Sequence, residues 1–224
     1  MNYNLWKNKC HVKILCAFLL ALPFAVAAQT EDDLWNHPLN DGTLARFNRV
    51  CETMTQHKII KGGFVQTSSL NRLGRSLISR GNFAVDTSRG IIWDTLSPFP
   101  STTAVGRDFI VQSSGGKTAR MDASGNETFI RISQTMNAVF TGDSKTLTDT
   151  FEVYFTEKGG TWNLGLLPRD GAVKSFVKAI TMRGDSVLRE VFFQEQNGGT
   201  VRYELSGHSY PAELSADEKA LFTR

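Results

Sequence analysis

The chain has 224 residues, of which 41% are hydrophobic and 21% are charged, and its formal net charge is +3. Three lysines in the first 13 residues account for that excess, and residues 29–224, with 22 basic and 22 acidic side chains, carry no basic arm of the kind that binds nucleic acid or an anionic membrane surface. Only Cys51 lies beyond residue 28, which excludes an intramolecular disulfide there and leaves stability to a hydrophobic core.

The N-terminal segment has the order of features that is typical of a secretory signal peptide. Three lysines precede an apolar run over residues 14–28, which ends in Ala-Val-Ala at positions 25–27. The run is shorter than the roughly 20 residues of a membrane-spanning helix, although an uncleaved anchor is the alternative. We expect cleavage after Ala27 or Ala28 and a single mature domain of residues 29–224. Cys10 and Cys16 lie before or near the start of the run, so we expect no lipid on the chain itself.

The periodicity of apolar residues changes once along the chain. From Leu44 to Met54 they recur at three- and four-residue spacing, which predicts a helix from about Leu39 to His57. Beyond Gly62 the period becomes two, and the alternation over residues 76–85 predicts a strand.

The same alternation recurs at short intervals to the end of the chain. It predicts strands over residues 90–95, 108–112, 127–133, 150–156, 161–167, 178–183, 186–195 and 200–207. Helical pieces are expected near residues 134–140, at 170–176 as a short turn or helix, and at 215–222. Many short strands joined by tight turns, such as the glycine turn at 114–117, imply a mostly antiparallel sheet, sandwich or barrel.

Motifs for catalysis and metal binding are missing from the sequence. His37, His57 and His208 have no metal-ligand spacing to another His, Cys or carboxylate pair. There is no Gly-x-Ser-x-Gly pentad of a serine hydrolase, and Ser114–Thr118 is a poor phosphate loop because Val111 stands where the first glycine is required. We therefore expect no enzyme, no catalytic residue, no cofactor and no metal.

The distinctive side chains are large and apolar. They could fill an ordinary core, or they could line the concave face of a curved sheet that cannot close and needs a lid or a ligand. The spacing is compatible with both interpretations. The candidate lipid-contacting residues are Phe64, Leu77, Phe83, Trp93, Phe99, Phe109, Phe140, Phe155, Trp162 and Leu166.

Five segments resemble, in order and separation, those of the outer-membrane lipoprotein carrier (LolA) family. They are Gly62–Gln66, Leu77–Phe83, Gly90–Trp93 with the loop Pro98–Ser101, Trp162–Pro168 and Asp185–Gly198. They are similar to the family's Phe-x-Gln strand after its first helix, a strand ending in a Gly-x-aromatic step, the next strand with its Pro-containing loop, a Trp-x-Leu-x-x-x-Pro element, and a strand with a glycine turn. The agreement runs from about Phe47 to Gly207.

The resemblance implies a fold and a function. The fold would be a half-open, incomplete antiparallel β-barrel with helices covering an apolar cavity. The function would be that of a monomeric periplasmic carrier, which shields the acyl chains of a lipoprotein or another acylated lipid and moves them from the inner to the outer membrane. By the same resemblance, an inner-membrane ATP-driven extractor would load it and an outer-membrane acceptor would unload it. A non-enzymatic β-rich envelope structural or protein-interaction module with a filled core is the alternative.

Two side-chain placements follow as predictions. We expect Phe83, Trp93 and Phe109 to share the concave side of one sheet. The family's lid is held by the arginine of an Arg-Pro pair about six residues after the glycine that corresponds to Gly81, and Arg89 is the nearest substitute in this sequence. We predict that Arg89 donates hydrogen bonds to backbone carbonyls near residues 136–142, the alternative being an exposed arginine in a turn.

Overall fold

Alternating side chains organise most of the chain into strands, which the computed structural model describes over residues 31–70, 75–122 and 127–223. The predicted signal peptide at residues 1–28 lies outside the described residues. The strands are β1 Ile59–Leu70, β2 Arg75–Asp86, β3 Gly90–Ser97, β4 Ser101–Val105, β5 Phe109–Ser114, β6 Lys117–Asp122, β7 Phe151–Lys158, β8 Thr161–Pro168, β9 Val177–Gly184, β10 Leu188–Glu195 and β11 Thr200–Ser209.

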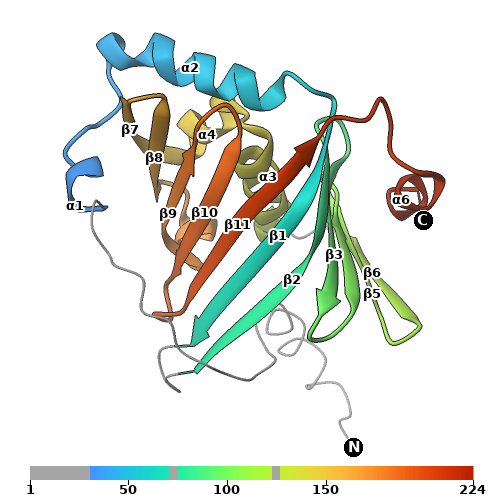
Figure 1. Ribbon diagram of the computed structural model, residues 1–224. Coiled ribbons are helices and arrows are strands. Elements are labelled where there is room, and N and C mark those ends of the chain that lie inside the picture. Colours follow the sequence, from blue (N-terminus) through green and yellow to red (C-terminus); the bar gives the residue numbers. More distant parts are fainter. Residues whose placement is uncertain (1–30, 71–74, 123–126, 224) are drawn as a thin grey trace, which may run out of the picture.

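The eleven described strands form one antiparallel sheet in the order β6-β5-β4-β3-β2-β1-β11-β10-β9-β8-β7. Each strand pairs with a sequence neighbour except across the centre, where β1 pairs with β11. The sheet curves strongly, and its two outermost strands, β6 and β7, do not meet (Figure 1). The predicted fold class, a mainly β, half-open antiparallel barrel with helices, is confirmed.

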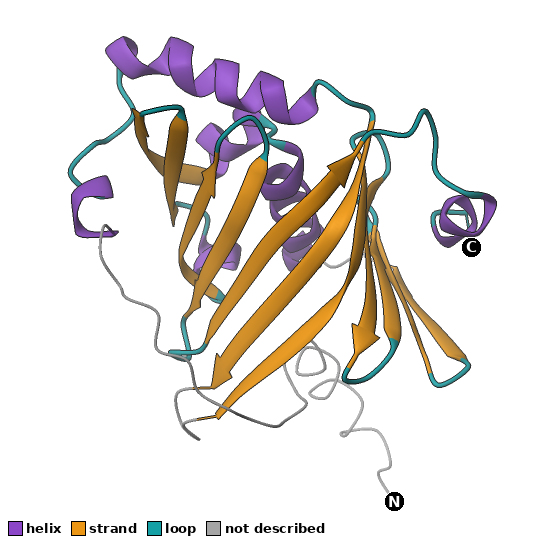
Figure 2. Ribbon diagram, in the orientation of Figure 1, coloured by secondary structure: helices purple, strands orange, loops and turns teal. Residues whose placement is uncertain are grey.

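The described helices are α1 Glu31–Leu34, α2 Asp41–Thr55, α3 Glu127–Thr141, α4 Ser144–Thr150, α5 Gly171–Lys174 and α6 Ala216–Leu221. Helices α2 to α5 lie over the concave face of this sheet, whereas the segments of α1 and α6 lie against its convex face. Figure 2 shows α2 across the upper end of the sheet and α6 apart from the other helices, beside the C-terminus. The predicted helices at 39–57, 170–176 and 215–222 are thus present.

Local capping explains where the first long helix begins. The Asn40 side chain accepts a hydrogen bond from the Gly42 N–H at 3.0 Å, and Thr43 interacts with the Asn40 backbone in return, which forms a capping box. The apolar stripe of α2 then buries Phe47 and Met54 against the sheet. The apolar spacing in the sequence thus determines which face of α2 packs into the concave core.

Two hydrophobic cores lie on opposite sides of the sheet. The larger core fills the concave side, between the strands and helices α2 to α5. The smaller core lies on the convex side and includes Ile59, Ile92 and Leu214, with Leu221 and Phe222 of the α6 segment packed against it. The C-terminal segment therefore covers the outside of the sheet and contributes nothing to the concave core.

The sequence prediction differs from the structure at several elements, which include the short, unpredicted helix α1. Residues 127–133, predicted as a strand, form the first half of α3, because a short apolar alternation there continues into a helical stripe that buries Ala138 and Val139. Strands β4 and β6 were not predicted, since β4 is short and β6 is almost entirely exposed and polar. Helix α4 was not predicted either; the Asp143 side chain caps it by accepting from the Thr146 N–H at 3.1 Å.

The two edges of the open sheet are protected in different ways. Along β7, the backbone of residues 37–39 adds a short bridge: the Leu39 N–H donates to the Val153 carbonyl at 2.8 Å, and the Phe155 N–H donates to the His37 carbonyl at 2.9 Å. Along β6, the exposed side chains include the charged Lys117, Arg120 and Asp122, of which Arg120 pairs with Asp122 at 2.7 Å.

Candidate functional site

The concave face carries a cluster of aromatic side chains around Trp93. The Trp93 ring centroid lies 5.0 Å from those of Phe64 and Phe140, in edge-on contacts. Tyr203 and Phe83 complete the cluster, with centroids 4.7 and 6.0 Å from that of Trp93. Such separations are favourable for aromatic pairs. Because Phe140 belongs to α3 and the other rings belong to strands, the aromatic cluster joins the sheet to its helical cover.

Seven of the predicted lipid-contacting residues lie together in the concave core. Each is less than a tenth exposed; they are Phe64, Phe83, Trp93, Phe140, Phe155, Trp162 and Leu166. Gly62 is paired with Phe83, and a Cβ at Gly62 would approach the Phe83 ring to 2.7 Å, so the missing side chain makes room for that ring. The role of these seven residues as lipid contacts stays a prediction.

Three of the candidates lie outside this core, and two of these, Leu77 and Phe99, belong to neither core. Leu77 is half-buried near the start of β2 and is not part of the concave core. Phe99 lies in the loop between β3 and β4, and 50% of it is exposed. In a loop, no neighbouring strand buries the ring. The alternation of β3 does not extend to residue 99, so it could not predict this exposure.

The prediction that Phe109 shares the concave face with Phe83 and Trp93 is wrong. Through the paired positions of β3, β4 and β5, Phe109 and Val111 share the convex face with Ile92. There the Phe109 ring lies in the smaller core beneath the α6 segment. Strand β5 begins with three consecutive apolar residues, so both phases are apolar and alternation alone does not determine the face.

Arg89 does not make the predicted lid contact. It lies in the turn between β2 and β3 with 43% of its side chain exposed, and its Nε lies 3.7 Å from Oδ2 of the buried Asp86. In the described part of the chain, no hydrogen bond links its side chain to residues 136–142. Arg89 is therefore an exposed arginine in a turn, which was the alternative prediction.

A different residue ties helix α3 to the sheet. The Asn137 Nδ2 donates a hydrogen bond to the carbonyl of Gly106, in the loop between β4 and β5, at 3.1 Å. At its N-terminal half, α3 is linked to the residue that caps α5 by an ion pair between Arg131 Nη1 and Asp170 Oδ2 at 3.3 Å. The cover is therefore held mainly by apolar packing and by few polar contacts.

Replacing Asn137 with alanine is expected to loosen α3 and to lower the free energy of unfolding by about 1 kcal/mol, the net worth of one hydrogen bond. Urea denaturation measures the stability, and hydrogen exchange measures the opening of α3. Asn163→Ala is the control, because Asn163 contacts Thr156 on the convex side at 3.4 Å. Equal exchange of the α3 amides in the two variants would contradict the assignment.

A small apolar pocket lies at the end of the sheet that α2 covers. Its apolar wall includes Met54, Ile60, Phe83, Phe140, Leu188 and Leu205. The enclosed space is about 30 Å³, room for about one or two water molecules. Sites for small ligands usually measure roughly 300–1,000 Å³. The concave face is therefore filled by side chains in this conformation.

Polar rings surround this pocket. His57, from the segment after α2, stacks on Tyr210, from the segment after β11, with centroids 3.8 Å apart and ring planes 22° apart. The His208 ring lies edge-on to Phe83 at 5.6 Å. Nδ1 of His208 is buried and has no hydrogen-bond partner among the described residues. An apolar pocket thus contains one unpaired polar atom.

The protonation of His208 should make stability depend on pH. Burial lowers the pKa of His208 below 6.5 and the charge of Arg189 adds to this, while the Leu188 carbonyl and Asp185 act in the opposite direction. A lowered folded-state pKa means that the unfolded chain binds the proton more readily, so stability is fully present above pH 6.5 and is lost as pH falls through the folded-state pKa.

We therefore expect the melting temperature to fall between pH 7 and pH 5, and to fall less in His208→Gln. Circular dichroism melts at several pH values measure this difference. A His208→Gln curve parallel to the parent's would contradict the expectation.

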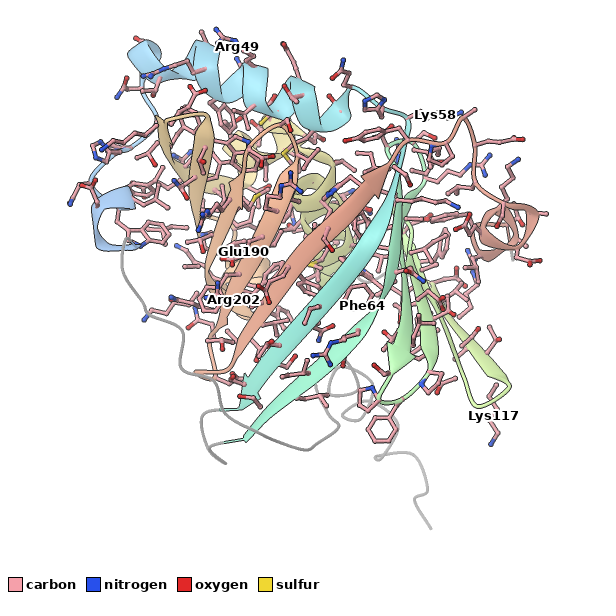
Figure 3. The ribbon with its side chains drawn as sticks, viewed as in Figure 1. Arg49, Lys58, Phe64, Lys117, Glu190 and Arg202 are labelled. Atoms are coloured by element: carbon pink, nitrogen blue, oxygen red, sulfur yellow. The ribbon has the colours of Figure 1, made fainter. Side chains whose placement is uncertain are left out.

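The convex face has hollows of a different character. The larger, about 450 Å³, is lined by charged side chains that include Arg183, Glu190 and Glu204. Glu190 forms an ion pair with Arg202 at 2.6 Å, and Figure 3 shows the two next to each other on the front of the sheet. Such a surface does not suit an acyl chain, which leaves the concave side as the candidate apolar site.

The described residues contain no group of three or more His, Cys, Asp or Glu side chains placed to hold a metal ion, and none of their helices has both the length and the apolar character needed to cross a membrane. Burial, with Asp143 and Glu52 adding, raises the pKa of Cys51 to about 12, so its thiol stays protonated.

Sequence reasoning missed His208 and Asn137. The alternation of β11 places Tyr203 and Leu205 inward and predicts an outward His208. However, β11 has an extra residue between Ser206 and Ser209, which shifts the phase and turns His208 toward the pocket. Gly207, with φ 63°, lies in this bulge, and a glycine inside a predicted strand was the sequence feature that could have indicated it. Asn137 had no signal beyond its place in the predicted helical piece.

Comparisons with known proteins give one family match. A family model described as "Outer membrane lipoprotein carrier protein LolA-like" matches residues 45–223. No curated protein matches the chain in sequence.

Several solved structures are similar at low identity. A LolA superfamily protein from Nitrosomonas europaea is 9% identical, with a TM-score of 0.44 over 81% of this chain and 97% of its own. A DUF1329 family protein from Desulfovibrio piger is 9% identical, with a TM-score of 0.45 over 81% and 100%. The lipoprotein LppX from Mycobacterium tuberculosis is 13% identical, with a TM-score of 0.41 over 79% and 100%.

Proposed function

The chain belongs to the LolA-like family of outer membrane lipoprotein carrier proteins, and on this premise we propose that it is a non-enzymatic carrier that shields acyl chains between the concave face of its sheet and its helical cover. The cargo is a lipoprotein or another acylated lipid. The proposal requires no catalytic residue, metal or cofactor.

One observation carries this proposal. The concave face is continuously apolar, and its aromatic cluster reaches from the sheet to α3 through the contact of Trp93 with Phe140. Aromatic and aliphatic side chains packed against a movable cover give an acyl chain the surroundings that it would have in a membrane. The sheet is a fixed wall, while α3 is attached through the Asn137 contact and apolar packing.

The filled concave face means that cargo can enter only when the cover moves. Each buried methylene contributes about 0.8 kcal/mol, so ten methylenes contribute about 8 kcal/mol. That is similar to the whole stability of a typical domain, roughly 5–15 kcal/mol. An acyl chain can therefore offset the displacement of α2 and α3, and the closed form is the empty state of the carrier.

The cellular setting is part of the proposal. Residues 1–28 act as a signal peptide, and residues 29–224 work as a monomeric single domain in the periplasm. An inner-membrane ATP-driven extractor loads this domain, and an outer-membrane acceptor unloads it. Because acyl chains do not cross water unaided, such a carrier supports the transport of lipids or lipoproteins to the outer membrane.

The filled concave face also favours a second candidate function. A β-rich envelope structural or protein-interaction module needs no space for a ligand, and its aromatic residues serve as an ordinary core. The two functions differ in whether the core side chains and the helices move aside to make room for an acyl chain.

Lipid extraction and native mass spectrometry of the protein purified from the periplasm separate these functions. A carrier should contain acylated molecules, bind a diacylated lipopeptide and begin at residue 28 or 29. Purified protein that holds no acyl species, and binds neither the lipopeptide nor a hydrophobic dye, would favour the interaction module.

A further inference from the structure

The small pocket beneath α2 lies where the concave core reaches the end of the sheet. Met54, Phe83, Phe140 and Leu205 belong both to the pocket wall and to the concave core. Phe83 is in addition a neighbour of Trp93 in the aromatic cluster. A chain that passes through this pocket would therefore reach the aromatic cluster directly.

The two stacked rings beside this pocket, His57 and Tyr210, lie outside the strands. His57 lies between α2 and β1, and Tyr210 follows the last residue of β11. Their stack joins two connecting segments, and 43% of Tyr210 is exposed. Because both residues lie outside the strands, rotation of their side chains would leave every strand pair in place.

His208 gives the pocket a chemical preference. Its Nδ1 is buried without a hydrogen-bond partner among the described residues, and the ring also interacts with the backbone carbonyl of Leu188, which acts as a hydrogen-bond acceptor. Burial keeps the ring neutral near pH 7 by lowering its pKa. With the proton of the neutral ring on Nε2, Nδ1 holds a lone pair and accepts hydrogen bonds. An alkyl chain cannot satisfy this atom, whereas a group with an N–H or O–H can.

We infer that this pocket receives the polar head of the cargo, and that His208 Nδ1 accepts a hydrogen bond from an amide N–H or a hydroxyl group attached to the acyl chain. The inference rests on the proposed carrier function. The acyl chain passes Phe83 and enters the aromatic cluster, while the head stays beneath His57 and Tyr210. The ligand class is thus an acyl chain joined to a hydrogen-bond donor.

Three probes with the same dodecanoyl chain test this inference by competition with a fluorescent fatty acid. N-methyldodecanamide carries an N–H, 1-monododecanoylglycerol carries hydroxyls, and methyl dodecanoate carries no donor. The unaltered mature protein should bind the amide, the glyceride or both about five- to tenfold more tightly than the ester, as one paired buried acceptor would give. The amide and glyceride arms show which donor the pocket prefers.

Variants at His208 assign the preference to one atom. His208→Phe keeps a ring without an acceptor and should remove the five- to tenfold preference of the amide or glyceride over the ester. His208→Gln keeps an acceptor oxygen and should retain part of the preference. His37→Phe is the matched control outside the pocket and should change none of the affinities.

The outcomes also distinguish the inference from the function on which it rests. Equal binding of all three probes to the unaltered protein would overturn the inference and leave the carrier function standing, and so would a preference that His208→Phe does not alter. Binding of none of the probes would overturn both. Since the first comparison uses the unaltered protein, a poorly folded variant does not decide the result.

Discussion

Replacing Trp93 with alanine is expected to lower the free energy of unfolding by about 3–5 kcal/mol, the usual cost of deleting a buried aromatic side chain. Trp93 is 8% exposed and lies between strand residues and Phe140 of α3. Its loss leaves a void at the joint between sheet and cover, which the surrounding rings cannot fill by small movements. Guanidinium denaturation followed by circular dichroism measures the change.

Trp35 is the matched control for this prediction. It is a half-buried tryptophan that contacts Tyr154 at 5.2 Å on the convex side of β7. Trp35→Ala should cost clearly less, because fewer packing contacts are lost. A Trp93→Ala protein no less stable than Trp35→Ala would show that the aromatic cluster does not hold the cover to the sheet.

Phe83→Glu is expected to weaken acyl-chain binding by about tenfold or more, because a carboxylate in the path of an alkyl chain must lose its hydration when the chain binds. Phe83 is 4% exposed but lines the pocket next to His208. In the empty carrier, the new carboxylate can reach water at the pocket or pair with His208. We therefore expect a folded protein with a lowered melting temperature, measured by circular dichroism, and loss of retained fluorescent fatty acid.

Phe109→Glu is the matched control on the opposite face. Phe109 is 8% exposed, and its ring lies 3.9 Å below the Arg120 guanidinium and 6.4 Å from the Phe222 ring. The change should loosen the C-terminal segment and leave acyl binding near that of the parent. If Phe83→Glu yields only unfolded chains, the concave face is an ordinary core and the interaction module is the better interpretation.

The sequence predicts the fold well wherever one periodicity dominates. The stripe of α2 and the alternation in β2 place Phe47 and Phe83 correctly, because the large apolar residues of each element lie mostly in one phase. The prediction fails where both phases are apolar, as at Phe109, and where a short alternation is also compatible with a helix, as over residues 127–133. Burial by a distant segment, α6, determines the face of Phe109, and local sequence does not contain that information.

The polar details of the site depend on geometry that the sequence does not display. The resemblance pointed to Arg89 because of its position after Gly81, yet the buried Asp86 in the same turn holds that side chain locally. The contact between Asn137 and Gly106 joins residues 31 positions apart. A single extra residue in β11 reverses the direction of His208. Each of these is a register or tertiary effect, whereas periodicity reports only local structure.

The edges of the open sheet have a consequence for how the protein behaves at high concentration. A strand edge with free N–H and C=O groups is a template on which another copy can add a strand and begin a fibre. Residues 37–39 occupy that position along β7, and charged side chains discourage it along β6. A barrel that must stay open to admit its helices would otherwise carry a permanent risk of self-assembly. A shortened chain beginning after Leu39 would keep all eleven described strands and yet expose β7 to its own copies.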